Sequence, residues 1–232
     1  RVGAWVWLTP PFGGRMLPPV VRVITGLAFA IPMTPVAMAN AGDISLSAVD
    51  ILLQFVLQLV IGVALGLVCL ILITAVQSAG AVIDVAGGFS LDAAYDPTVI
   101  SRVYQLIASV VLLVSGAYLI LFAGFARTFE ALPIGAGLDL SVTASTLTHA
   151  ISVSFVAILQ IAGPILAVLL LTDIGLGLLT RVAPTINAFV LSFPIKIGLT
   201  LLLVGVAIPH LSPALAGLTD SSVDAMRAIA RK

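Results

Sequence analysis

The sequence predicts an all-α, polytopic membrane protein made of long, kinked helical hairpins. Two observations predict this fold class, and the first is composition: 61% of the 232 residues are hydrophobic, 9% are charged, and the mean hydropathy is +1.26. In soluble domains roughly a quarter of the residues are charged. The second observation is a series of long charge-free runs without the alternating pattern of a membrane barrel. Helices that lie among lipid or other apolar chains are therefore expected.

Five charge-free runs reach the ~20 residues that a membrane-spanning helix needs. They cover residues 23–42, 51–83, 103–126, 140–172 and 197–219. Residues 1–9 precede them and predict the tail of a helix that the stretch TPPFGG at 9–14 ends. Pro32 and Pro35 are expected to interrupt the first run, and Pro133 with Gly135 to end the third.

The second run carries a polar and small-residue stripe. As one helix from Asp50 to about Gly80 it would extend ~45 Å, against a hydrocarbon core of ~30 Å. Within it, four residues recur at every fourth position and so share one side of the helix: Gln54, Gln58, Gly62 and Gly66. The stripe is either an ordinary tight helix contact or a polar seam that faces partner subunits or a wet channel.

Residues 80–102 predict a connector within a single membrane domain that covers residues 1–232. Its glycine, aromatic and acidic residues are typical either of irregular backbone that lines a cavity or of a plain solvent loop. Arg127 and Glu130 stand three residues apart and are expected to pair. Residues 213–232 predict an amphipathic C-terminal tail, with acidic residues early and basic residues late.

Pro194 and Lys196 lie in the apolar stretch 187–205. Proline there deprives the carbonyl of Val190 of its usual partner, and a cation is not tolerated facing lipid. A bent helix that is buried against protein is therefore expected. The positive-inside rule supports this, because a uniform crossing of every run would leave the basic tail outside.

Two function classes remain open on the residues alone. One is a subunit of a larger membrane complex, in which the buried charges form pairs that set assembly rather than carry protons. Those charges are Asp84, Asp173, Arg181 and Lys196. The other class is a secondary transporter for a small solute that uses broken helices and Asp173, Arg181 and Lys196.

Several other classes are not expected. The net charge is zero and the basic residues are scattered, which excludes a nucleic-acid surface. The sequence has no Walker phosphate loop, no nucleophile elbow and no H-E-x-x-H pattern, so we expect neither an enzyme nor a cofactor. Cys69, His149 and His210 are too scattered for a metal site.

Three stretches, 10–30, 92–135 and 175–205, carry a resemblance that runs over nearly the whole chain. Its most specific elements are Asp96-Pro97, the turn Leu132–Gly135, Arg181 with Ala183-Pro184, and Phe193-Pro194 with Lys196. With these elements the chain resembles the FliR/SctT family of type III secretion export-gate subunits. The flagellar branch is favoured by the turn at 132–135 and by the match over 181–198.

The resemblance implies a pore-forming subunit of the flagellar export gate, with no catalytic role. Such subunits join FliP and FliQ next to FlhB, with FlhA nearby, in a helical assembly. The implied location is the bacterial inner membrane at the flagellar basal body, where unfolded flagellar proteins cross the pore.

The resemblance also implies that residues 87–97 form part of a plug that closes the pore. The plug residues carried over by position are Gly87, Gly88, Phe89, Leu91, Tyr95, Asp96 and Pro97. Phe89, Leu91 and Tyr95 would supply the apolar seal. Between Asp96-Pro97 and Val99 the chain is several residues shorter than the family pattern, so the plug is either compact or lacks residues there.

Overall fold

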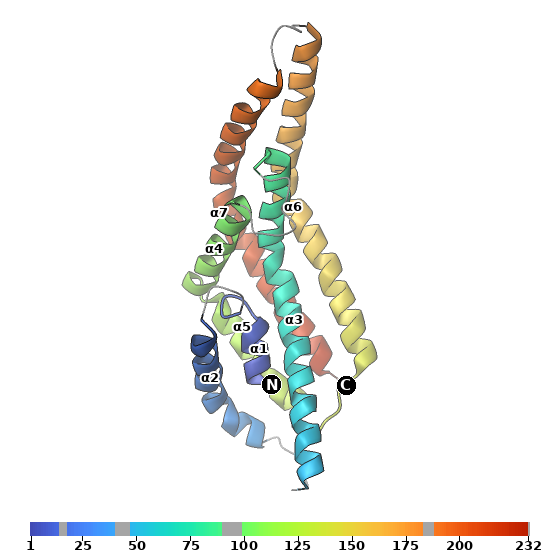
Figure 1. Cartoon of the computed structure of the whole chain (residues 1–232). Coiled ribbons are helices and arrows are strands. Elements are labelled where there is room, and N and C mark those ends of the chain that lie inside the picture. The colour runs from blue at the N-terminus through green and yellow to red at the C-terminus, as the bar shows by residue number, and fades with distance from the viewer. Residues whose placement is uncertain (14–17, 40–46, 90–98, 183–187, 232) are drawn as a thin grey trace. The chain divides into compact units, whose positions relative to one another are not determined.

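The chain is all-α in the computed structural model, which describes residues 1–13, 18–39, 47–89, 99–182 and 188–231 (Figure 1). Within these ranges there are seven helices and no strand, and the predicted fold class is confirmed. The helices are α1 (Val2–Leu8), α2 (Pro19–Ala39), α3 (Ala48–Gly87), α4 (Val99–Val114), α5 (Ala117–Ala131), α6 (Leu140–Val182) and α7 (Ala188–Ala230).

Four of the described helices, α2, α3, α6 and α7, are long and apolar enough to cross a membrane. A fifth span is added if the bent pair α4 and α5 counts as one. Helices α3, α6 and α7 contain 40, 43 and 43 residues, which at 1.5 Å per residue is about twice the hydrocarbon thickness. The protein is a multi-pass membrane protein whose longest helices exceed one simple crossing.

Prolines do not divide these helices, which corrects the expected interruption at Pro32 and Pro35. Helix α2 continues through both residues, and α6 continues through Pro164. Helix α7 also continues through Pro194, and the bend expected in that region stays a prediction. In an apolar environment an opened helix turn finds no water to replace its hydrogen bonds, so the helix persists around the proline.

A break that the sequence did not reveal lies inside the run 103–126. Gly116 adopts a left-handed conformation with φ of +73°, which separates α4 from α5. The N–H of Ala117 donates to Oγ of Ser115 at 3.3 Å, and the N–H of Leu119 donates to the Gly116 carbonyl at 2.9 Å. A new helix therefore starts where a continuous one was expected.

Three predicted connectors and tails also differ from the structure. Helix α3 extends to Gly87 and α4 begins at Val99, so the predicted connector 80–102 is shorter at both ends. Helix α6 runs through Gly175 and Gly177 to Val182, where a short glycine-rich piece was expected. The predicted tail 213–232 is not separate, because α7 runs without a break to Ala230.

The chain forms two compact units, each made of discontinuous segments. Unit 1 contains residues 1–73, 112–154 and 216–232, and unit 2 contains residues 74–111 and 155–215. Helices α3, α6 and α7 each contribute to both units. The assignment of residues 1–232 to one membrane domain stays a prediction.

An aromatic cluster forms the centre of unit 1. Trp5 of α1 is fully buried and stacks on Phe125 of α5, with ring centroids 4.5 Å apart. Phe122 meets Trp5 edge-on at 5.0 Å and Phe29 of α2 at 4.0 Å. Such aromatic pairs contribute about 0.5–1.5 kcal/mol each beyond burial. They fix the seven-residue helix α1, which is too short to be stable by itself.

Candidate functional site

The end of α3 in unit 2 is closed by a glycine-dependent cap. Gly88 has φ of +78°, its N–H donates to the Val85 carbonyl at 3.3 Å, and the Phe89 N–H donates to the Asp84 carbonyl at 3.0 Å. These two bonds form a Schellman motif, in which the left-handed position favours glycine. The motif turns the chain out of α3 at a defined residue and begins the connector to α4.

Asp84 holds the far end of the same connector. Its side chain is fully buried, and its carboxylate accepts the Ile100 N–H at Oδ1, at 3.0 Å, and the Ser101 N–H at Oδ2, at 2.8 Å. Both donors belong to the first turn of α4, where N–H groups lack helical partners and the helix dipole favours negative charge. Residue 84 therefore binds both ends of the connector, one through its carbonyl and the other through its side chain.

Gly80 allows this capping contact to form. It lies four residues before Asp84, on the same side of α3. A Cβ atom at Gly80 would stand only 2.8 Å from the Cα atom of Ser101. Because the position carries no side chain, the first turn of α4 can approach α3 closely enough for the carboxylate to reach two amides.

The start of the connector, at Gly87 and Gly88, also packs against α7. A Cβ at Gly87 would lie 2.8 Å from Oγ1 of Thr200, and one at Gly88 would lie 3.6 Å from the ring of Phe193. Thr200 is fully buried. Phe193 and Thr200 are two helical turns apart, so two turns of α7 support the last turn of α3.

Lys196 lies between those two residues along α7 and forms an ion pair with Asp173 of α6. Its Nζ is 2.6 Å from Oδ1 of Asp173, and the two side chains are 18% and 48% exposed. The pair fastens α7 to α6, which lie side by side in unit 2 (Figure 1). At this exposure an ion pair contributes at most about 1 kcal/mol in water, and more where lipid or protein excludes water.

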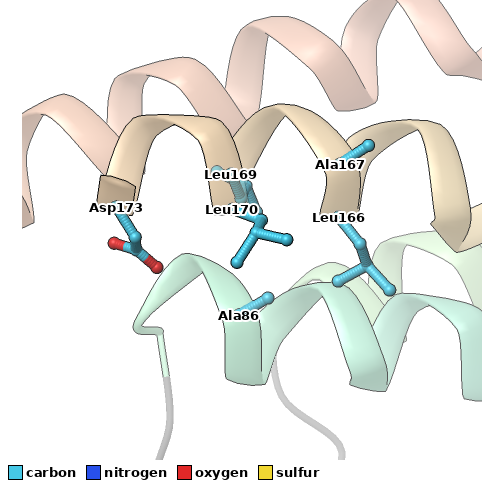
Figure 2. A pocket seen from close by; sticks show the side chains of 6 residues that line it. All are labelled: Ala86, Leu166, Ala167, Leu169, Leu170 and Asp173. Atoms are coloured by element: carbon cyan, nitrogen blue, oxygen red, sulfur yellow. The ribbon is translucent and has the colours of Figure 1, made fainter. Parts of the chain in front are cut away.

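A cavity of about 350 Å³ is lined in part by Asp173, the acid of this ion pair, and Figure 2 shows the residues that line it. Its wall is apolar except for Asp173, which lies at one end beside the last turn of α3. The lining residues are Ala86, Leu166, Ala167, Leu169, Leu170 and Asp173. We use the name connector junction for the capped ends of the connector together with the Asp173–Lys196 pair.

The structure brings together only some of the residues that the sequence proposes for function. Gly87, Gly88 and Phe89 are at the connector junction, whereas Leu91, Tyr95, Asp96 and Pro97 lie outside the described residues. Asp84, Asp173 and Lys196 also belong to the junction, but Arg181 follows Asp173 by eight residues, about 12 Å along the helix. Arg127 and Glu130 line one cavity, yet no ion pair joins them in the described structure.

The predicted stripe on α3 lies in unit 1 and has two different halves. Gly62 packs against the backbone of Arg1, and Gly66 packs against Leu8, where a Cβ would meet the side chain at 2.9 Å. These two glycines form a tight helix contact within the chain. Oε1 of Gln54 and both amide atoms of Gln58 are buried without a hydrogen-bond partner among the described residues, and the seam as a partner surface stays a prediction.

Sequence reasoning missed the capping role of Asp84, which it expected to pair with a cation. The pattern that could have revealed it is Gly80-x-x-x-Asp84, followed by Gly87-Gly88. The glycine four residues earlier marks a close approach, and the glycine pair marks the end of the helix.

Comparison with known proteins shows the family of the chain. Residues 1–222 match the family described as bacterial export proteins, family 1. The flagellar biosynthetic protein FliR of Escherichia coli K12 is 31% identical, covering 92% of this chain and 83% of that protein. FliR of Pectobacterium carotovorum is 30% identical with the same coverage.

A protein whose name refers to translocation is also similar. The Yop proteins translocation protein T of Yersinia pestis is 28% identical, covering 72% of this chain and 67% of that protein. The similarity thus extends beyond proteins named FliR, and the family match covers residues of both structural units. The chain belongs to family 1 of the bacterial export proteins, the FliR/SctT family of type III secretion export-gate subunits.

Proposed function

We propose that the chain is a pore-forming subunit of the flagellar type III export gate in the bacterial inner membrane, at the basal body. It assembles with FliP and FliQ beside FlhB, with FlhA nearby, and unfolded flagellar proteins cross the pore. Support for the flagellar branch comes from identity: 30% and 31% over 92% of the chain with FliR proteins, against 28% over 72% with the Yop proteins translocation protein T.

Residues 87–97 act in this proposal as part of the plug of the closed pore. A closed gate must block ions and later admit an unfolded chain, so its constriction has to move without unfolding the helices around it. The observation that carries the proposal is the double attachment at Asp84. With both ends fixed there, opening of the proposed plug would leave the end of α3 and the start of α4 in place.

The transporter alternative has less support. It requires Asp173, Arg181 and Lys196 to act at one solute site, but Lys196 is already paired with Asp173 and Arg181 lies two turns further along α6. A transporter would purify alone and bind a small solute, whereas a gate subunit would be unstable without its partner chains.

Deletion of residues 90–95 tests the plug. This deletion leaves the Schellman motif and the Asp84 cap intact, so we expect the complex to assemble and the membrane to become leaky to small solutes. Replacement of the same six residues by glycine and serine keeps the length and removes the apolar seal, and it should also leak. Conductance equal to that of the native complex, in an assembled gate, would refute the plug.

A further inference from the structure

Unit 1 contains a second cavity, of about 360 Å³, at the ends of α5 and α7. Three arginines, Arg127, Arg227 and Arg231, line it together with the acid Glu130. The other lining residues are Thr128, Ala131 and Ala230. The function proposed above assigns no role to this cavity. Its volume lies near the lower limit of ligand pockets, roughly 300–1,000 Å³, which suits a phosphodiester headgroup better than a protein segment.

Carboxylates of the protein neutralise only part of the positive charge of this cavity. Arg227 has a carboxylate partner, since its Nη1 lies 3.1 Å from Oδ1 of Asp224. The side chains of Arg127 and Arg231 are exposed and pair with no acid in the described structure. Glu130 is the one acid among the lining residues, so with Asp224 and Glu130 both counted, one of the three arginine charges remains in excess.

These arginines are also not needed to cap α5. A basic residue in the last turn of a helix ordinarily binds the terminal carbonyls. Arg1 already does so, because its guanidinium donates to the carbonyls of Thr128 at 3.2 Å and Leu132 at 2.9 Å, and lies 4.4 Å from the ring centroid of Phe129. Burial lowers the pKa of Arg1 to about 10, which leaves it charged near neutral pH.

We propose that this cavity binds the phosphate of an anionic phospholipid headgroup. Two guanidinium groups from different helices can bind a phosphate in bidentate fashion. Basic pockets at the ends of membrane helices meet anionic headgroups at the lipid surface. Helix α7 is long and apolar enough to cross a membrane, and its C-terminal end lines this cavity, so the arginines of α7 follow a candidate membrane span.

Native mass spectrometry of the full chain in its membrane assembly tests the site, with bilayers of phosphatidylglycerol or phosphatidylcholine as the lipid source. The native protein should prefer phosphatidylglycerol, and the double variant Arg127→Gln/Arg231→Gln should lose about 30-fold of that preference, as expected for removal of two interfacial cations. Arg102→Gln, an exposed arginine of α4 outside the cavity, is the matched control and should change nothing.

Glu130→Gln provides an opposite test if the double variant fails to fold. It removes the acid of the cavity and should strengthen phosphatidylglycerol binding. Unchanged lipid preference in both variants would overturn the proposal, and so would an equal loss in Arg102→Gln. Displacement of the lipid by millimolar inorganic phosphate would assign the site to a free anion, and loss of a bound acidic chain instead of lipid would assign it to a protein partner.

Discussion

Removal of the Asp84 carboxylate should release the first turn of α4. Asp84→Ala leaves the Ile100 and Ser101 N–H groups, now bound at 3.0 and 2.8 Å, without their acceptor in a buried location. Hydrogen bonds to a charged group contribute about 1.5–3 kcal/mol each, so the two together stabilise the turn by about 3 kcal/mol at the lower limit. Since about 1.4 kcal/mol corresponds to a factor of ten, the open state of the turn should become on the order of 100-fold more populated.

Hydrogen exchange measured by mass spectrometry on the full chain in its membrane assembly gives this population directly. Peptides that cover residues 99–104 should exchange about 100-fold faster in Asp84→Ala, since amide exchange follows the population of the open state. Asp84→Asn retains one acceptor oxygen and should give a smaller increase. Asp220→Ala, which removes an exposed acid of α7, is the control and should leave these peptides unchanged.

The reasoning fails if residues 99–104 keep their protection in Asp84→Ala. It also fails if residues 222–230 of unit 1 lose protection to the same degree, because the variant would then unfold the chain as a whole. Selective loss at α4 is the result that identifies Asp84 as a cap.

Two further predictions concern the other charges. Lys196→Ala should reduce co-purification with FliP-like and FliQ-like chains. The double variant Asp173→Lys/Lys196→Asp should restore co-purification, because it rebuilds the 2.6 Å ion pair with reversed signs. An intact complex of Lys196→Ala that no longer secretes would mean that Lys196 acts in transport instead. Hydrogen bonds from the Ser141 hydroxyl and from the Val142 and Ser141 amides hold the pKa of Asp139 below its ordinary value, so its cap of α6 is fully present above roughly pH 4 and is lost as the pH falls through the lowered pKa. The protection of the first amides of α6, taken relative to their intrinsic exchange rate at each pH, should therefore fall in acid in the native protein but not in Asp139→Asn, and an equal fall in both would contradict this role.

Hydropathy predicted the helices well because lipid leaves a backbone few alternatives. The turn after Leu8 and the end of α5 before Pro133 and Gly135 were predicted from proline and glycine, and α1 and α5 end there. The same reasoning from proline was wrong at Pro32 and Pro35, where a helix break was predicted and α2 continues. Rules for prolines come largely from chains in water, where a broken hydrogen bond can be replaced by solvent.

Tertiary contacts decided what the sequence could not. Gly116 stands in an apolar run like Gly62 and Gly66, yet it breaks the helix while those two pack inside one. Nothing in the local pattern separates these outcomes, because each glycine permits both. The partner of Asp84 was missed for a related reason: a cation is visible in a sequence, whereas two free amides become a binding site only when α4 returns to α3 at Gly80.

The attachment at Asp84 also bears on the length of the connector. A loop whose ends are far apart needs enough residues to span the gap, whereas a loop whose ends meet at one residue has no such minimum beyond the turn itself. The entropy cost of closing a loop grows only slowly with its length, by about 0.6 kcal/mol for each doubling of the number of loop residues. A loop can therefore gain or lose residues with little change in the free energy of folding. The shorter segment before Val99 that the resemblance implies therefore need not strain α3 or α4. A compact connector and an intact connector junction are compatible, so the plug proposed for residues 87–97 would depend on the apolar character of its residues rather than on their number.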